Sequence, residues 1–220
     1  MGKNRYEKKG EKMYKIKLEQ ISRWGVSTVR DSFNKLPTTD HRDGKYRLRR
    51  YSKIKLSDTD HSKYMKMESE AFNQPTHYNQ FQGGIDRKFE DIEDEVVESG
   101  GMLEMCDTFL KSSGFSDDHE IEIHQIRIVT GNELTPVSPE GVHQDGYKFI
   151  AMVGINRYNI AGGNLLVYKT REGEPVVDFP LDDGEMIMLD DKAVWHNATP
   201  IKQVSYSVQG WMDAFILTAR

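Results

Sequence analysis

The chain has 220 residues, 37% of them hydrophobic, and a net charge of −5 at pH 7, as expected of one globular domain. This acidic balance gives no overall attraction to nucleic acid or to an anionic membrane, and no apolar run is long enough to cross a bilayer. The single cysteine, Cys106, excludes an intramolecular disulfide, and the Lys-rich start lacks the apolar core of a signal peptide, so we expect a cytoplasmic protein.

The first half of the chain mixes helical and extended patterns. Residues 1–17 are rich in lysine and are predicted to be flexible, ahead of one domain over residues 18–220. Residues 17–36 have irregular helical spacing that ends before a proline. Residues 46–56 alternate as a strand does, with four cations and Tyr51 on one face.

Two further helices are predicted before the middle of the chain. They follow residues 77–89, in which two consecutive glycines indicate a turn. Residues 89–99 and 102–114 then read as helical, and Gly114 is placed to end the second helix.

The second half predicts short strands separated by turns. The β-rich runs are residues 121–129, 147–155, 164–169, 175–179, 185–189, 204–208 and 211–219. Such a series is typical of an antiparallel barrel or sandwich. The expected fold is therefore α+β, with a barrel-like antiparallel core and helices packed outside it.

One candidate metal site lies in this second half. His143 and Asp145 stand two apart in a stretch that reads as a β-segment, so they share one face. His196, on a later predicted strand, is the candidate third ligand. Two imidazoles and a carboxylate suit non-haem Fe(II), with three positions open for a co-substrate and O2. A Zn site with the same ligands, or a set of hydrogen-bonded core residues, fits the pattern too.

The sequence around these residues resembles a bacterial family of Fe(II)/2-oxoglutarate dioxygenases, the one that includes the L-isoleucine 4-hydroxylase. The similar segments, in the family's order, are YRLRRYSKI (46–54), YNQFQGGIDRKF (78–89), HQIRI (124–128), PEGVHQDG (139–146), INRYNIAGGN (155–164), LDDKAVWHNATPI (189–201) and GWMDAFILTA (210–219). The resemblance implies the double-stranded β-helix, a jelly-roll or cupin-like fold. It implies that His143, Asp145 and His196 bind Fe(II), with 2-oxoglutarate and O2 as co-substrates. It also implies hydroxylation of a free amino acid or similar small molecule, with decarboxylation of 2-oxoglutarate to succinate.

The chain departs from this family near its end. Family members read glycine, aromatic, arginine, aspartate, whereas this chain has Met212 at the arginine position. Methionine cannot pair with the distal carboxylate of 2-oxoglutarate, as arginine does. We therefore expect another cation to bind the co-substrate, with Arg127 ranked first, Arg157 second and Arg220 third.

Other polar residues are candidates for substrate contacts or for support of the metal. The substrate-binding candidates are Glu140 for an amine, Arg47 for a carboxylate, and Tyr78 and Asn79 in a lid. Asp190 and Asp191 precede the distal histidine and could orient an imidazole, although turn carboxylates are an equal interpretation.

Other functions remain open on the sequence alone. The reaction could be another 2-oxoglutarate-dependent oxidation, such as sulfoxidation, desaturation or cyclisation. The basic face of residues 46–56 could bind a phosphate backbone in a nucleic-acid-modifying oxygenase, which the acidic balance disfavours. The loss of the arginine at Met212 also allows a non-catalytic, metal-binding cupin-like protein. A membrane partner is not expected, and the sequence does not predict an oligomeric state.

Overall fold

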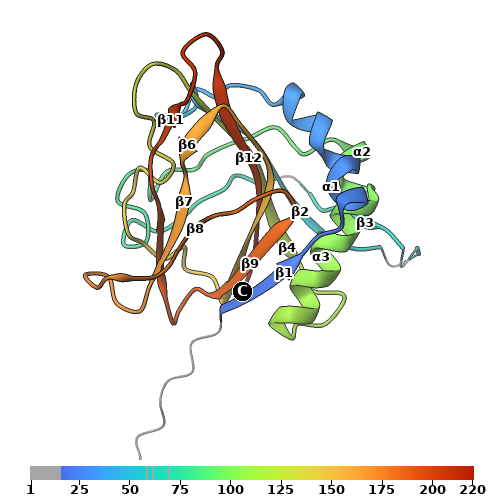
Figure 1. The fold of residues 1–220 in the computed structure, drawn as a ribbon. Coiled ribbons are helices and arrows are strands. Elements are labelled where there is room, and N and C mark those ends of the chain that lie inside the picture. Colours follow the sequence, from blue (N-terminus) through green and yellow to red (C-terminus); the bar gives the residue numbers. More distant parts are fainter. Residues whose placement is uncertain (1–15, 58, 61, 69) are drawn as a thin grey trace, which may run out of the picture.

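Two β-sheets face each other, and helices cover the outer face of the larger one (Figure 1). The computed structural model describes residues 16–220 except 58, 61 and 69. The larger sheet is antiparallel, in the order β1 (Ile16–Gln20), β9 (Glu185–Asp190), β5 (Phe149–Tyr158), β12 (Gly210–Ala219), β4 (Ile121–Thr130), β2 (Arg47–Leu56) and β3 (Tyr64–Lys66).

The smaller sheet lies across from β5, β9 and β12. Its strands are β10 (Trp195–Ala198), β7 (Asn164–Tyr168) and β8 (Pro175–Pro180), and a separate ladder joins β11 (Ile201–Gln203) to β6 (Ile160–Gly162). One apolar cluster fills the space between the sheets: Ile150, Leu165, Val167, Ile187, Leu189 and Val194. Because the chain passes from one sheet to the other and back, the core is a double-stranded β-helix, or jelly roll, as the sequence predicted.

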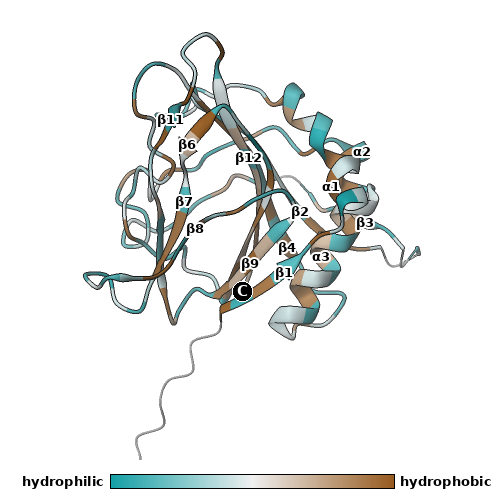
Figure 2. Ribbon diagram, in the orientation of Figure 1, coloured by the Kyte–Doolittle hydropathy of each residue, from teal (hydrophilic) through white to brown (hydrophobic). Residues whose placement is uncertain are grey.

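The helices pack their apolar side against the outer face of the large sheet. They are α1 (Arg23–Val29), the 3-10 helix η1 (Arg30–Lys35), α2 (Asp94–Val97) and α3 (Gly100–Ser113). The buried side chains of α3 recur three or four residues apart and include Met102, Met105, Cys106, Phe109 and Leu110. Hydrophobic residues occur both along α3 and on the neighbouring strands in Figure 2, and their buried side chains form one cluster.

Both ends of α3 follow from its sequence. The Ser99 hydroxyl accepts a hydrogen bond from the backbone N–H of Met102 and so caps the first turn. Gly114 ends the helix in the left-handed conformation, with φ of 74°, as predicted. None of the helices among the described residues is long and apolar enough to span a membrane.

Three predictions in the first half need correction. The helix expected from residue 17 begins at Arg23, because residues 16–20 extend the edge of the large sheet as β1. Ile16 and Lys17 are therefore not part of a flexible terminus, and residues 1–15 lie outside the described residues. Within residues 89–99, only Asp94–Val97 are helical.

One predicted strand of the second half is absent. Residues 204–208 form bends and turns, although their apolar residues alternate. Val204 and Tyr206 are 65% and 75% exposed, so the alternation does not mark a buried face. The side chain of Asn159 holds this segment, because its amide hydrogen-bonds with the backbone of Ser205 and Val208.

Candidate active site

A backbone bridge brings two distant histidines together. The N–H of His143 donates to the carbonyl of His196, and the N–H of His196 donates to the carbonyl of His143, both at 2.9 Å. His196 lies on β10 in the smaller sheet, whereas His143 precedes β5 of the larger one. The centroids of the two rings are 4.3 Å apart.

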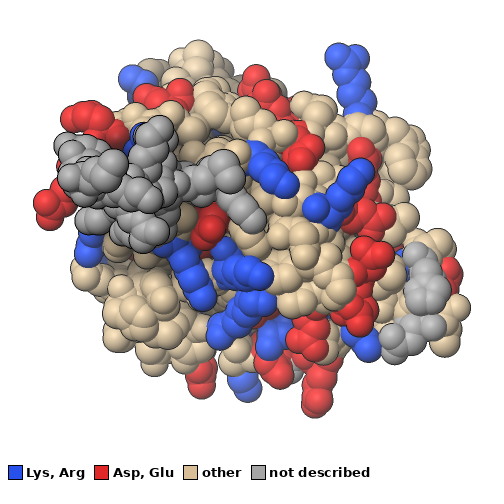
Figure 3. All heavy atoms as spheres, turned by 90° about the horizontal axis from the view of Figure 1, so that it is seen from below, with Lys and Arg blue, Asp and Glu red and all other residues tan. Residues whose placement is uncertain are grey.

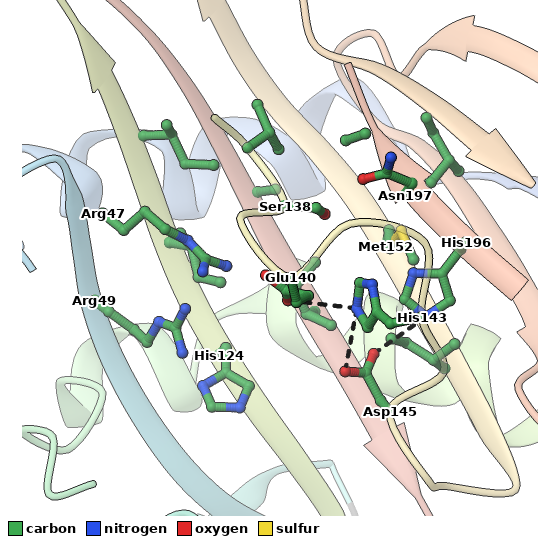
Figure 4. A pocket seen from close by; sticks show the side chains of 18 of the residues that line it. Arg47, Arg49, His124, Ser138, Glu140, His143, Asp145, Met152, His196 and Asn197 are labelled. Atoms are coloured by element: carbon green, nitrogen blue, oxygen red, sulfur yellow. Dashed lines mark ion pairs between the residues drawn. The ribbon is translucent and has the colours of Figure 1, made fainter. Parts of the chain in front are cut away.

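Asp145 joins the histidines from a loop. Residues 141–148 are not the expected β-segment, because within them only His143 forms a bridge. Oδ1 of Asp145 is 3.6 Å from Nε2 of His143, and Oδ2 is 3.3 Å from Nε2 of His196 (Figure 4). Ligand atoms of the three residues all lie within 4.8 Å of one another. The predicted triad therefore converges, although loop conformation rather than strand alternation places the carboxylate.

Asp191 fixes the loop that carries Asp145. Its carboxylate is fully buried and accepts hydrogen bonds from the backbone N–H groups of Asp145, Gly146 and Tyr147, at 2.7 to 3.0 Å. Oδ1 of Asp191 also lies 3.4 Å from Nε2 of His196. Asp190 makes none of these contacts. Of the two aspartates that the sequence analysis considered as supports for the metal ligands, Asp191 is therefore the one that contacts them.

The chemistry of the three donors fits a metal ion. Nδ1 of His143 lies 2.8 Å from the carbonyl of Gly141; donation there leaves Nε2 unprotonated and free to ligate. Nε2 of His196 is buried and has no hydrogen-bond partner among the described residues. Two imidazole nitrogens and a carboxylate at these separations form the 2-His-1-carboxylate set of non-haem Fe(II) sites.

Burial and the neighbouring charges set the protonation of the triad. Burial lowers the pKa of His196, but the carboxylates of Asp145 and Asp191 outweigh this effect and raise it to about 10. Burial raises the pKa of Asp145, yet the two imidazoles hold it well below its usual range. The carboxylate is therefore ionised, as a metal ligand must be, whereas His196 has to release a proton when a metal binds.

A second group of residues supports Asp145 from the side of the 73–89 loop. Nε2 of Gln74 donates to Oδ1 of Asp145 at 2.8 Å. Oε1 of Gln74 in turn accepts hydrogen bonds from Asn79 and Arg87, at 3.0 and 3.1 Å. Gln74 was not predicted, because a lone glutamine in a loop has no spacing that indicates a ligand.

A cavity opens from the triad over the inner face of the large sheet, and strand register arranges its floor in rows. One row runs from Arg47 on β2 through Ile128 and Met212 to Arg157 on β5. The next row runs through Arg49, Ile126, Ala214 and Gly154. A third row contains His124, Ile216 and Met152. At Gly154 the backbone of Leu181 and Asp182 approaches so closely that a Cβ would lie 2.5 Å from the carbonyl oxygen of Asp182, so this end of the second row is closed.

A β-bulge turns Arg157 into this cavity. The register of β5 against β12 shifts between Asp213 and Ala214, so one residue of β5 is skipped and Arg157 shares a face with Gly154. Met212 is its direct cross-strand partner. Nη2 of Arg157 donates to the carbonyl of Gly162 at 2.5 Å, whereas Nη1 is buried without a partner among the described residues.

The other two arginines proposed for the co-substrate lie elsewhere. Arg127 makes two hydrogen bonds to the carboxylate of Asp213, at 2.6 and 2.8 Å, and a third to Asn34, and it does not line the cavity. Arg220 lies over the ring of Tyr147, also outside the cavity lining.

Three of the four predicted substrate-binding residues line the cavity, namely Glu140, Arg47 and Asn79. Tyr78 does not; its ring instead covers Gly146, where a Cβ would come within 2.5 Å of the ring. The polar lining residues that the sequence analysis did not propose for the site include Gln74, Arg87 and His124. Arg49 lines the cavity as well, and it was recognised only as part of the basic face of residues 46–56.

The basic face of β2 is not an exposed track for phosphates. Arg49 is only 5% exposed, and Arg47 is paired with Asp43 at 2.8 Å. On the surface seen in Figure 3, basic side chains lie among acidic ones rather than in one continuous area. The geometry therefore removes the observation that motivated a nucleic-acid substrate.

A buried 2-His-1-carboxylate site at the mouth of a jelly roll defines a non-haem iron oxygenase. The comparison with protein families agrees: the model of the 2OG-Fe dioxygenase family matches residues 30–218, and the chain belongs to this family. It is thus an oxidoreductase that uses Fe(II), 2-oxoglutarate and O2. No curated protein that was compared matches the chain.

Solved structures share the fold. A BsmA homologue from Methylobium petroleophilum is 28% identical, with a TM-score of 0.73 over 89% of this chain and 81% of that one. IDO from Bacillus thuringiensis is 18% identical, with a TM-score of 0.69 over 88% and 80% of the two chains. The Fe(II)/α-ketoglutarate-dependent dioxygenase TqaL is 13% identical, with a TM-score of 0.67 over 93% and 82%.

Proposed function

We propose that the enzyme hydroxylates a C–H bond of a free amino acid or a similar small molecule, as its resemblance to the L-isoleucine 4-hydroxylase group suggests. His143, Asp145 and His196 hold the iron. When bound, Fe(II) with 2-oxoglutarate and O2 supplies the oxidation, in which 2-oxoglutarate loses CO2 to become succinate and one oxygen atom enters the substrate. The cytoplasm remains the proposed location, in keeping with the buried, free Cys106.

The observation that carries the substrate proposal is the polar lining of the cavity. Glu140 lies beside the triad, with Oε1 at 3.4 Å from Nε2 of His143, and its Oε2 is buried without a hydrogen-bond partner among the described residues. A buried carboxylate oxygen needs a donor, and the ammonium group of an amino acid is a matching one. Guanidinium groups on the same cavity wall supply the opposite charge for a carboxylate.

A turnover assay tests this function. The enzyme with Fe(II), 2-oxoglutarate and each standard L-amino acid is expected to release succinate above the substrate-free rate, together with a product that gains one oxygen atom. A product that instead loses two hydrogens would identify desaturation or cyclisation, and oxygen on sulfur would identify sulfoxidation. Succinate release that no amino acid stimulates would contradict the proposed substrate class.

We assign the distal carboxylate of 2-oxoglutarate to Arg157. This residue is the cross-strand partner of Met212, where the family carries its arginine, and a Cβ built on Gly163 would lie 3.1 Å from its Nη1 and 3.2 Å from Sδ of Met212. The guanidinium group of Arg157 thus lies beside the position that the family's arginine side chain would extend from at residue 212. Its buried, unpartnered Nη1 is a donor for an incoming carboxylate.

Arg157→Met is expected to weaken 2-oxoglutarate binding about 10- to 100-fold, the effect of losing a charge-assisted hydrogen bond. Calorimetry on Zn(II)-loaded protein measures this affinity without turnover. The matched control is Arg171→Met, because Arg171 is exposed. Adding Met212→Arg to the Arg157→Met variant should restore binding. Unchanged affinity in Arg157→Met would assign the carboxylate to another cation.

A further inference from the structure

Three buried guanidinium groups meet at the β2 side of the cavity. Arg47 and Arg49 reach inward from β2, near His124 of β4 and across from the triad (Figure 4). Arg87 joins them from the 73–89 loop. Arg49 is 5% exposed and Arg87 is 3% exposed, so water solvates neither charge well.

The carboxylates nearby form an ion pair with only one described member of this cluster, Arg47, although Asp43 and Glu140 also attract Arg49 and Arg87 through space. Asp43 is paired with Arg47 at 2.8 Å, and its other oxygen accepts from Gln82 at 3.0 Å. Arg87 donates to Gln74 and lies over the ring of Phe72. These contacts leave the charge on the cluster only partly balanced.

Arg49 differs from Arg47 and Arg87 because no side-chain hydrogen bond to another described residue holds its guanidinium group. Its guanidinium lies over the ring of Phe89, 5.1 Å from the centroid, and forms no ion pair with any described carboxylate. Burial, reinforced by Arg47, lowers its pKa to about 9, so it remains a cation at pH 7. A buried cation without an anion is costly unless a ligand supplies one.

A neutral donor lies beside this cation. His124 is 6% exposed, and its Nδ1 has no hydrogen-bond partner among the described residues. The rings of Tyr51 and Phe72 hold the imidazole, with centroids at 4.7 and 4.4 Å. Burial keeps the pKa of His124 well below its usual value, so the ring is neutral and offers one N–H.

This site is separate from the one assigned to 2-oxoglutarate. Arg49 and Arg157 lie on β2 and β5, three strands apart in the order β2, β4, β12, β5. At about 4.8 Å per strand, about 14 Å separates their backbones. A five-carbon co-substrate held between the triad and Arg157 therefore leaves Arg49 for a second anion.

We infer that Arg49, with the N–H of His124 beside it, binds the carboxylate of the substrate that is hydroxylated. This assignment rests on the proposed function and moves the carboxylate contact from the predicted Arg47, which Asp43 already neutralises, to Arg49. The substrate class is then a small carboxylate whose anionic end lies on β2 and whose reacting carbon lies toward the triad.

The first test needs no knowledge of the substrate. Arg49→Met removes a buried, unpaired charge, so the melting temperature of the ligand-free protein should stay unchanged or rise. Arg47→Met is the matched comparison on the same strand and should lower the melting temperature, because it leaves the buried Asp43 carboxylate unpaired. A fall with Arg49→Met as large as that with Arg47→Met would mean that Arg49 is structural, and would overturn the inference.

The second test measures binding. Zn(II)-loaded protein with 2-oxoglutarate is titrated by calorimetry with the standard L-amino acids and with the carboxamide of the tightest binder. We expect the carboxamide to bind at least about 10-fold more weakly than the acid, and Arg49→Met to weaken the acid by a similar factor while 2-oxoglutarate affinity stays the same. Arg49→Lys should recover part of the loss.

Two results would contradict the assignment while leaving the proposed function intact: equal binding of the acid and its carboxamide, or full affinity for the acid in Arg49→Met. No amino acid bound by the wild type would contradict the proposed substrate class itself. If Arg49→Met lost 2-oxoglutarate binding and Arg157→Met kept it, Arg49 would bind the co-substrate and Arg157 the carboxylate of the substrate. Failure of the wild type to bind 2-oxoglutarate at all would instead contradict the proposed function, so the two failures are distinguishable.

Discussion

His143→Ala is expected to reduce succinate formation by more than about 100-fold, beyond what loss of an outer partner of a metal ligand costs. The variant leaves two ligands, and the neighbouring side chains of Glu140 and Asp191 offer carboxylate oxygens in place of the lost imidazole nitrogen. The fold should persist, because the ring lines the cavity and is not part of the apolar clusters. Succinate release measures the effect, and the melting temperature checks the fold.

His119→Ala is the matched control for this variant, since His119 does not line the cavity and its loss should leave turnover unchanged. If His143→Ala retained wild-type turnover while folded, the iron would have to be held by other residues. The same experiment with His196→Ala should give an equal loss, because both imidazoles serve one ion.

Asp191→Ala is expected to lower the free energy of unfolding by about 3 kcal/mol, because three backbone N–H groups in a partly buried loop lose their fully buried acceptor. It should also weaken metal binding, since Asp145 sits on the loop that Asp191 holds. Urea unfolding measures the first effect, and Zn(II) titration measures the second. A loss of stability with unchanged Zn(II) affinity would mean that the loop still positions Asp145. A loss of both would mean that Asp145 is displaced.

Asp190→Ala provides the control at the adjacent position. Asp190 is half-buried, and its carboxylate contacts neither the Asp145 loop nor His196. We expect a change in unfolding free energy within about 0.5 kcal/mol, as for surface substitutions. A loss in Asp190→Ala equal to that in Asp191→Ala would show that general disturbance of the end of β9, rather than the three hydrogen bonds, causes the effect.

The sequence predicted the architecture where periodicity alone decides it. The strands β2, β4, β7, β8, β9 and β12 follow runs of alternating or continuous apolar residues. The prediction failed for residues 17–20, where pairing with β9 at a sheet edge overrides a weak helical spacing. It failed again for residues 204–208, whose alternation reflects exposed apolar side chains.

In the active site, too, the residues with a local sequence signal were predicted, and those positioned by tertiary packing were not. The ligand types of His143, Asp145 and His196 were readable from the sequence, although the strand expected to align the first two is a loop. Partners such as Gln74 and His124 were not readable, because only the packing of distant segments gives them their role. Arg127, ranked first for the co-substrate, already has a buried partner in Asp213 that no local pattern reveals.

Because of the β-bulge in β5, the direction of the Arg157 side chain depends on the number of residues in that strand. A strand without the skipped residue would point the same arginine toward the helices and leave the pocket without this cation. Deleting one residue of β5 before Arg157 is therefore expected to abolish binding of 2-oxoglutarate, although no ionisable side chain is removed.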